Sequence, residues 1–180
     1  GIRYIRDGGT GSAFFADLND LATYGIHSTI VMDPRDGIDP STMVSKAIEP
    51  IIKSVVAVEG PNEWDDNPSL TWQGQSFPAG LRAYQTALYD AVKNSSDPAV
   101  QRIQVLSPSM ARPKSAFVVG PVPCDMGNLH SYPGGNLPDD KLNSMWIPDL
   151  RQMSGNRPIV TTETGYNYNL SNGMAGQPGI

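Results

Sequence analysis

The chain has 180 residues, of which 39% are hydrophobic and 17% charged, with a formal net charge of −5. This length and composition fit one domain with a buried core and exclude a disordered chain or a coiled coil. The 13 basic residues do not cluster and no apolar run reaches the roughly 20 residues that cross a bilayer, so neither nucleic acid nor a membrane is an expected partner.

Short runs rich in Val and Ile alternate with longer amphipathic stretches along the chain. In chain order, the short runs predict strands over 2–6, 28–32, 55–59, 103–107, 126–130 and 158–162. The stretches between them predict helices over 13–24, 41–53, 78–94, 114–119 and 141–153. Ser12 is a candidate cap for the first helix, and we expect Pro50 and Pro148 to disturb the second and the last.

This alternation is typical of an α/β fold with a parallel sheet, here interpreted as a single domain over 1–180 of the TIM (β/α)₈ barrel type. Active sites of such barrels lie at the carboxyl ends of the strands. Four predicted strand ends carry polar or aromatic groups. They are the segments 6–7, 60–65, 129–132 and 161–166.

Two of these strand ends carry a glutamate, Glu63 and Glu163. Facing each other across the mouth of a barrel, two carboxyl groups can cleave a glycosidic bond. One is protonated and helps the sugar oxygen to leave, while the other is ionised and attacks the anomeric carbon. The pair therefore predicts a glycoside hydrolase.

Asn62-Glu63 after one strand and Glu163 after another, three strands later, resemble the retaining (β/α)₈ glycosidases of clan A. The resemblance implies that Glu63 is the acid/base, that Glu163 is the nucleophile and that Asn62 binds the sugar 2-hydroxyl group. It also implies that Arg6 orients the nucleophile and that Tyr132 lies beside it. No cofactor is implied.

In that clan the acid/base follows strand 4 and the nucleophile follows strand 7. The six predicted strands then correspond to strands 2 to 7 of the barrel, and strands 1 and 8 are missing. A barrel of this kind has about 250 residues. We therefore expect a partial barrel with two open sheet edges, and a homo-oligomer that covers them.

Other candidate residues have two interpretations each. His130 can bind a sugar hydroxyl or support a carboxylate, whereas a zinc site is not expected because His27 begins the second strand, at the other end of the sheet. Trp64 and Tyr166 flank the two glutamates and are interpreted as walls of a sugar subsite, against plain packing. Asp33 follows the second strand and is a candidate contact for substrate hydroxyls, against the preferred interpretation of a solvated loop carboxylate.

Three functions remain open at this level. The leading hypothesis is a retaining hydrolase acting on a β-linked oligo- or polysaccharide. The second is a carbohydrate-binding relic of such a barrel without catalysis, and the third is a fragment whose main property is self-association through its open edges.

Overall fold

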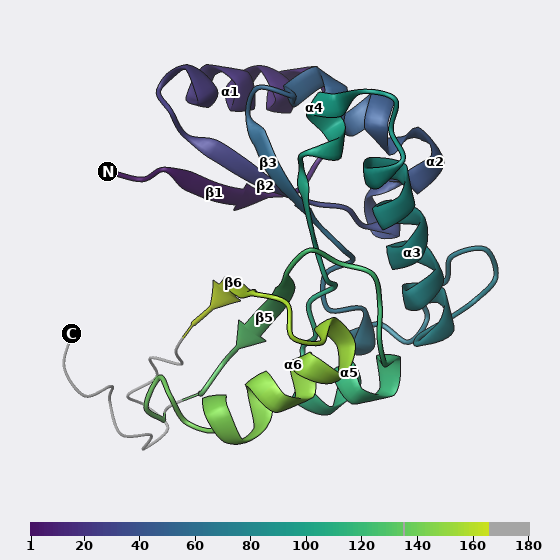
Figure 1. The fold of residues 1–180 in the computed structure, drawn as a ribbon, viewed down its shortest axis with the longest axis vertical. Helices are drawn as coiled ribbons and strands as arrows, with labels where there is room; N and C mark the ends of the chain where they lie inside the picture. The colour runs from purple at the N-terminus through teal and green to yellow at the C-terminus, as the bar shows by residue number, and fades with distance from the viewer. Residues whose placement is uncertain (135, 166–180) are drawn as a thin grey trace.

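The computed structural model describes residues 1–134 and 136–165, and a parallel strand occurs in it at each predicted position (Figure 1). The strands are β1 Tyr4–Asp7, β2 His27–Val31, β3 Val55–Glu59, β4 Gln104–Leu106, β5 Gly127–Ser131 and β6 Ile159–Thr164.

The strands lie in chain order in two parallel sheets, β1-β2-β3-β4 and β5-β6. A single parallel bridge between Leu106 and Met126 joins the end of β4 to the chain entering β5. Nearby, the Asp125 amide donates to the carbonyl oxygen of Val105 at 2.7 Å. The fold is therefore mixed α/β with parallel sheets, as the sequence predicts, and is consistent with part of a TIM-like fold.

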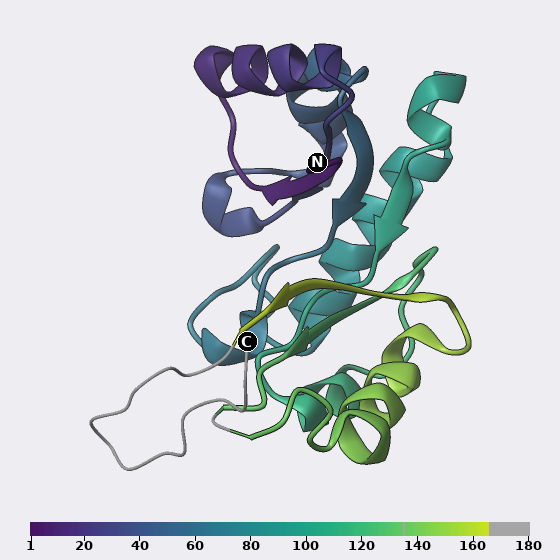
Figure 2. The same cartoon turned by 90° about the vertical axis from the view of Figure 1, so that its left-hand side faces the viewer.

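The helices are α1 Ser12–Thr23, α2 Pro40–Met43, α3 Ala79–Lys93, α4 Pro98–Gln101, α5 Pro113–Val119 and α6 Ile147–Ser154. Figure 1 shows α5 and α6 beside β5 and β6, whereas α1 to α4 accompany the first four strands. In Figure 2 the same division is seen from the side, with α1 at one end of the molecule and α6 at the other. Within the described ranges, no helix is both long and apolar enough to span a bilayer.

Two predicted helices are less regular than expected. The stretch predicted over 41–53 is a short α2 followed by a π-helical turn, Val44–Ile48, and a 3-10 turn, Glu49–Ile51, that contains Pro50. Proline lacks the N–H that a continuing α-helix needs, so the helix changes its hydrogen-bonding pattern there. The last predicted helix likewise begins as a π-helical turn, Leu142–Trp146, before α6.

The predicted cap of the first helix is wrong. Gly11 occupies the N-cap position, Ser12 is the first helical residue, and no side-chain hydrogen bond caps α1. The Gly11 backbone has φ +129°, which favours glycine over residues with a β-carbon.

The core lies between the sheets and the helices, and its largest side chains include Trp64, Tyr84 and Met153, all fully buried. The Tyr84 hydroxyl keeps a partner in this apolar setting by donating to the carbonyl oxygen of Ile38 at 2.9 Å. Trp146, at the end of the π-helical turn before α6, is also buried.

Candidate active site

The carboxyl ends of three strands and the loop after a fourth bring the predicted polar residues together. Arg6 lies on β1, Glu63 follows β3, His130 lies on β5 and Glu163 lies on β6. One carboxylate oxygen of each glutamate and a ring nitrogen of His130 all lie within 4.8 Å of one another. The two carboxyl groups therefore face the same small region of the structure, with His130 between them.

Glu163 is surrounded by groups that stabilise its ionised form. Arg6 Nη1 donates to Glu163 Oε2 at 3.1 Å, and the Tyr132 hydroxyl donates a short hydrogen bond to Oε1. Partial burial alone would raise the pKa of Glu163, but the hydrogen bond from Tyr132 and neighbouring positive charge, including that of Arg6, outweigh it and lower that pKa. Glu163 is therefore ionised at neutral pH.

Tyr132 is held in its protonated form. Burial, together with its hydrogen bond to the Glu163 carboxylate, raises the pKa of Tyr132 to about 12. The phenol therefore remains a donor to Glu163 over the whole physiological pH range.

Glu63 has a different environment. Its Oε1 lies 3.0 Å from His130 Nδ1, and its side chain is one quarter exposed. The backbone at Glu63 is left-handed, with φ 46° and ψ 46°, and its amide donates to the carbonyl oxygen of Ser109 at 3.1 Å. Left-handed backbone is uncommon for a residue with a side chain, and such residues concentrate at functional sites.

Arg6 connects three parts of this site. It forms a two-pronged ion pair with the fully buried Glu59, from Nε to Oε2 at 2.9 Å and from Nη2 to Oε1 at 2.5 Å. Nη2 also donates to Asn62 Oδ1 at 2.7 Å. Burial alone would lower the pKa of Arg6, but the hydrogen bond and charge of Glu59, with the charges of Glu163 and Glu63, outweigh it and raise that pKa. The guanidinium is therefore a permanent, fixed cation.

The backbone of Asn62 is held by hydrogen bonds to Asp33 and Arg35, which follow β2. Its amide donates to Asp33 Oδ2 at 3.0 Å, and its carbonyl oxygen accepts a short hydrogen bond from Arg35. Asp33 is itself paired with Arg35 and is only 2% exposed, so it is neither a contact for substrate hydroxyls nor the solvated loop carboxylate that the sequence favoured. The physical reason is that Arg35 and the Asn62 amide occupy its oxygens.

The predicted role of Trp64 is also wrong. Its side chain is fully buried in the core, and Nε1 donates to the carbonyl oxygen of Leu70 at 3.1 Å. An indole enclosed in this way cannot wall a sugar subsite. Tyr166, the other predicted wall, lies outside the described residues, whereas Tyr132 is 45% exposed beside Glu163.

Three residues of the site were missed from the sequence: Glu59, Asn128 and Thr162. Glu59 pairs with Arg6, and Thr162 contacts both His130 and Asn128. Glu59 ends a strand whose other residues are all apolar, and a charged residue in that position could have signalled a buried ion pair. Asn128 and Thr162 lie inside strands and give no comparable signal.

Glu63, His130 and Glu163 together carry donor atoms of the kind that can hold a metal ion. His27 lies at the first position of β2, away from this group, so the group contains one histidine. Arg6 contacts Glu163 directly, and its positive charge opposes a second cation at that carboxylate. We therefore base no chemical step on a metal.

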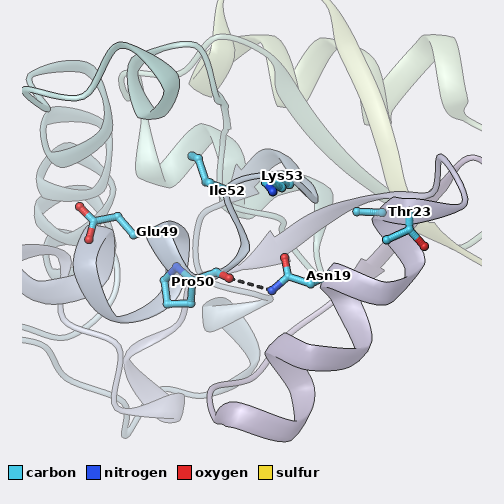
Figure 3. A pocket seen from close by; sticks show the side chains of 7 residues that line it. Asn19, Thr23, Glu49, Pro50, Ile52 and Lys53 are labelled. Atoms are coloured by element: carbon cyan, nitrogen blue, oxygen red, sulfur yellow. Dashed lines mark hydrogen bonds between the residues drawn. The ribbon is translucent and has the colours of Figure 1, made fainter.

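A separate hollow of about 570 Å³ lies between the end of α1 and the turn at Pro50 (Figure 3). Asn19 donates to the carbonyl oxygen of Pro50 at 2.9 Å across it. Its lining residues Thr23 and Lys53 come just before β2 and β3, so it lies at the amino ends of the strands. None of the groups described above lines it, and it is not the candidate active site.

Comparison with known proteins gives only a structural likeness. No family model and no curated protein matches the chain. Three similar solved structures are GH128 (subgroup I) endo-beta-1,3-glucanases from Amycolatopsis mediterranei, two of them alanine mutants, in complexes with laminari-oligosaccharides. The first, bound to laminaripentaose, has 15% identity and a TM-score of 0.49 over 95% of this chain and 65% of its own. The second has 14% identity and a TM-score of 0.48, over 98% of this chain and 68% of its own. The chain thus spans slightly less than two thirds of the first neighbour's length.

Proposed function

We propose that this chain is the catalytic part of a glycoside hydrolase that cleaves β-glycosidic bonds with retention of configuration. The observation that carries the proposal is the approach of Glu63 and Glu163 to within 4.8 Å at the carboxyl ends of the strands. Their unequal surroundings support it, because a retaining mechanism needs one ionised carboxyl and one that delivers a proton.

The reaction assigns one role to each glutamate. Glu163 attacks the anomeric carbon while Glu63 gives its proton to the departing glycosidic oxygen, which leaves a covalent glycosyl-enzyme. Glu63 then takes a proton from water, and that water displaces Glu163 from the sugar. Arg6 and Tyr132 hold Glu163 in place and stabilise its charge before the attack and after its release.

The first test replaces each carboxyl by its amide. We expect Glu63→Gln and Glu163→Gln each to lower kcat on an aryl β-glycoside by about 10³-fold or more, because each removes a proton donor or a nucleophile. Glu49→Gln is the matched control, since Glu49 lines the hollow at the opposite end of the strands. Circular dichroism checks the fold, and unchanged turnover in both site variants would exclude the assignment.

The second test separates the two roles. With azide as the nucleophile, Glu163→Ala should release a glycosyl azide of inverted configuration, because azide enters directly at the face that Glu163 has vacated. Glu63→Ala should release an azide of retained configuration, because azide then displaces the intact glycosyl-enzyme. Interchanged stereochemistry in the two variants would reverse the assigned roles.

The choice of sugar needs a substrate screen. It begins with the laminari-oligosaccharides bound in the three structures named above and extends to other β-linked glucans. Calorimetry is run beside the hydrolysis assay. Binding without hydrolysis would favour the alternative, a carbohydrate-binding protein, and would contradict the proposed reaction.

A further inference from the structure

A chain of hydrogen bonds runs from Glu63 into the interior behind His130. His130 Nδ1 lies 3.0 Å from Glu63 Oε1, and the opposite ring nitrogen, Nε2, lies 3.1 Å from Thr162 Oγ1. The Thr162 hydroxyl donates to Asn128 Oδ1 at 2.7 Å. His130 and Asn128 are buried, at 1% and 2% exposure, so these groups have no access to bulk water as an alternative partner.

The direction of this chain fixes the position of one proton. A threonine hydroxyl has a single hydrogen, and with the Asn128 amide oriented so that Oδ1 faces Thr162, that hydrogen is donated to Asn128. Its oxygen can therefore only accept from His130, which requires the hydrogen of a neutral imidazole to be on Nε2. The lone pair of Nδ1 then points at Glu63.

We propose that Asn128 and Thr162 are positioning residues that hold His130 as the Nε2–H tautomer, so that Nδ1 accepts a hydrogen bond from the protonated Glu63 carboxyl group, which keeps its proton. The catalytic consequence rests on the proposed function. A proton on Nδ1 would instead be donated to the Glu63 carboxylate and would favour the ionised form, which cannot act as an acid. The tautomer of His130 thus decides whether Glu63 is ready to protonate a leaving group.

No other neighbour of His130 named above takes over the role of Thr162 and Asn128 in setting its tautomer. Glu163 Oε2 lies 3.8 Å from Nδ1, beyond hydrogen-bond distance, and is already occupied by Arg6. Tyr132 donates to the other oxygen of Glu163. The Asn128 amide nitrogen has no partner among the described residues, so its orientation depends on the hydrogen bond between Oδ1 and Thr162.

The direct test reads the tautomer without any substrate. The chain has two histidines, so nitrogen-15 spectra of the imidazole rings at neutral pH are readily assigned by comparison with His27→Gln. We expect His130 to show a protonated Nε2 and an unprotonated Nδ1. A proton on Nδ1 would overturn the inference. A correct tautomer in an inactive protein would support it while removing the proposed function.

The kinetic test uses the pH dependence of kcat/KM. Thr162→Val removes the hydroxyl, and Asn128→Leu frees that hydroxyl to donate to Nε2, so both variants favour a proton on Nδ1. We expect the alkaline limb to move to lower pH by about 0.5 unit or more, equivalent to about threefold in proton affinity. Thr162→Ser keeps the hydroxyl and should leave the limb in place. The inference would be overturned if Thr162→Val and Asn128→Leu lowered kcat/KM by the same factor at every pH. It would also be overturned if Thr162→Ser moved the alkaline limb as far as Thr162→Val does.

Discussion

At the scale of single residues, the two glutamates Glu63 and Glu163 have identical side chains but different hydrogen-bond partners. Glu163 has a cation and a phenol donating to it, whereas among the described residues the Glu63 carboxyl group has one partner, a ring nitrogen of His130. A cation and a hydrogen-bond donor beside a carboxylate favour its ionised form, which at Glu163 is the form that attacks in the proposed reaction. The contrast supports an assignment in which Glu163 attacks and Glu63 protonates.

Tyr132 offers a test of this contrast. Tyr132→Phe removes a donor that lowers the pKa of Glu163, so that pKa should rise. Below it the nucleophile is protonated and inactive, so the acidic limb of kcat/KM should move to higher pH. At neutral pH we expect a loss of about 2- to 10-fold, as for removal of one hydrogen bond.

The control for that experiment is Tyr24→Phe, because Tyr24 is 74% exposed at the end of α1. It should leave the pH profile unchanged. If Tyr132→Phe also leaves the acidic limb in place, the phenol does not stabilise the charge of Glu163.

At the scale of elements, the sequence was sufficient to locate the strands and the two glutamates. Val- and Ile-rich runs between amphipathic stretches have few interpretations besides buried parallel strands. Residues that follow such runs meet at one edge of the sheet, which is why Glu63 and Glu163 could be placed together.

The sequence was not sufficient to predict side-chain contacts that depend on strand register and on how the loops pack. The pairing of β5 with β6 shifts register between Leu129 and His130, and such a shift changes which side chains share a face. The contacts of Asn128 and Thr162 depend on that shift. Trp64 is likewise buried because the chain folds into a 3-10 turn at Trp64–Asp66, a bend that strand periodicity does not encode.

The turn after β3 depends on Gly60. A β-carbon there would lie 2.1 Å from Gln85 Oε1 and 3.1 Å from the backbone nitrogen of Pro108. Gln85 is fully buried, and its Nε2 donates to the carbonyl oxygens of Leu106 and Pro123, so it cannot move away freely. Close packing of α3 against this turn therefore fixes the position of the loop that carries Glu63.

Gly60→Ala should lower the free energy of unfolding by about 1–3 kcal/mol, the usual cost of overpacking a core. Gly8→Ala is the matched control, because its β-carbon would meet Val31 at an ordinary 3.4 Å. Urea denaturation of both variants gives the comparison. Equal stability of the two variants would show that the Gln85 side chain can move away from the new β-carbon without lowering the free energy of unfolding.

At the scale of the whole molecule, the two sheets meet through few backbone links. β4 and the chain entering β5 share a single bridge. The six strands, taken together as one array, nevertheless bring β1 and β6 close enough for Arg6 Nη1 to donate to Glu163, 157 positions further along the sequence. Arg6, which is also paired with Glu59 on β3, therefore ties the two ends of the array together through Glu163 on β6. The same side chain that orients the proposed nucleophile also stabilises the fold that creates the site.

This double role predicts a large effect of Arg6→Ala. The fully buried Glu59 carboxylate would lose its cation, and an unpaired buried charge costs about 3–5 kcal/mol of unfolding free energy. Arg6→Ala combined with Glu59→Gln should recover part of that loss, because the buried charge is then gone. Activity should not return, because Glu163 would still lack its cationic donor and keep only the hydrogen bond from Tyr132.

The control is Arg112→Ala, which removes an exposed ion pair with Asp66 and should cost about 0–1 kcal/mol. Urea unfolding gives the stabilities, and the aryl glycoside assay gives the activities. If Arg6→Ala costs no more than Arg112→Ala, the ends of the array are held by other contacts. If the double variant regains activity together with stability, Arg6 acts only through the fold. Stability restored without activity separates the two roles of this one guanidinium, because only the orientation of Glu163 then remains lost.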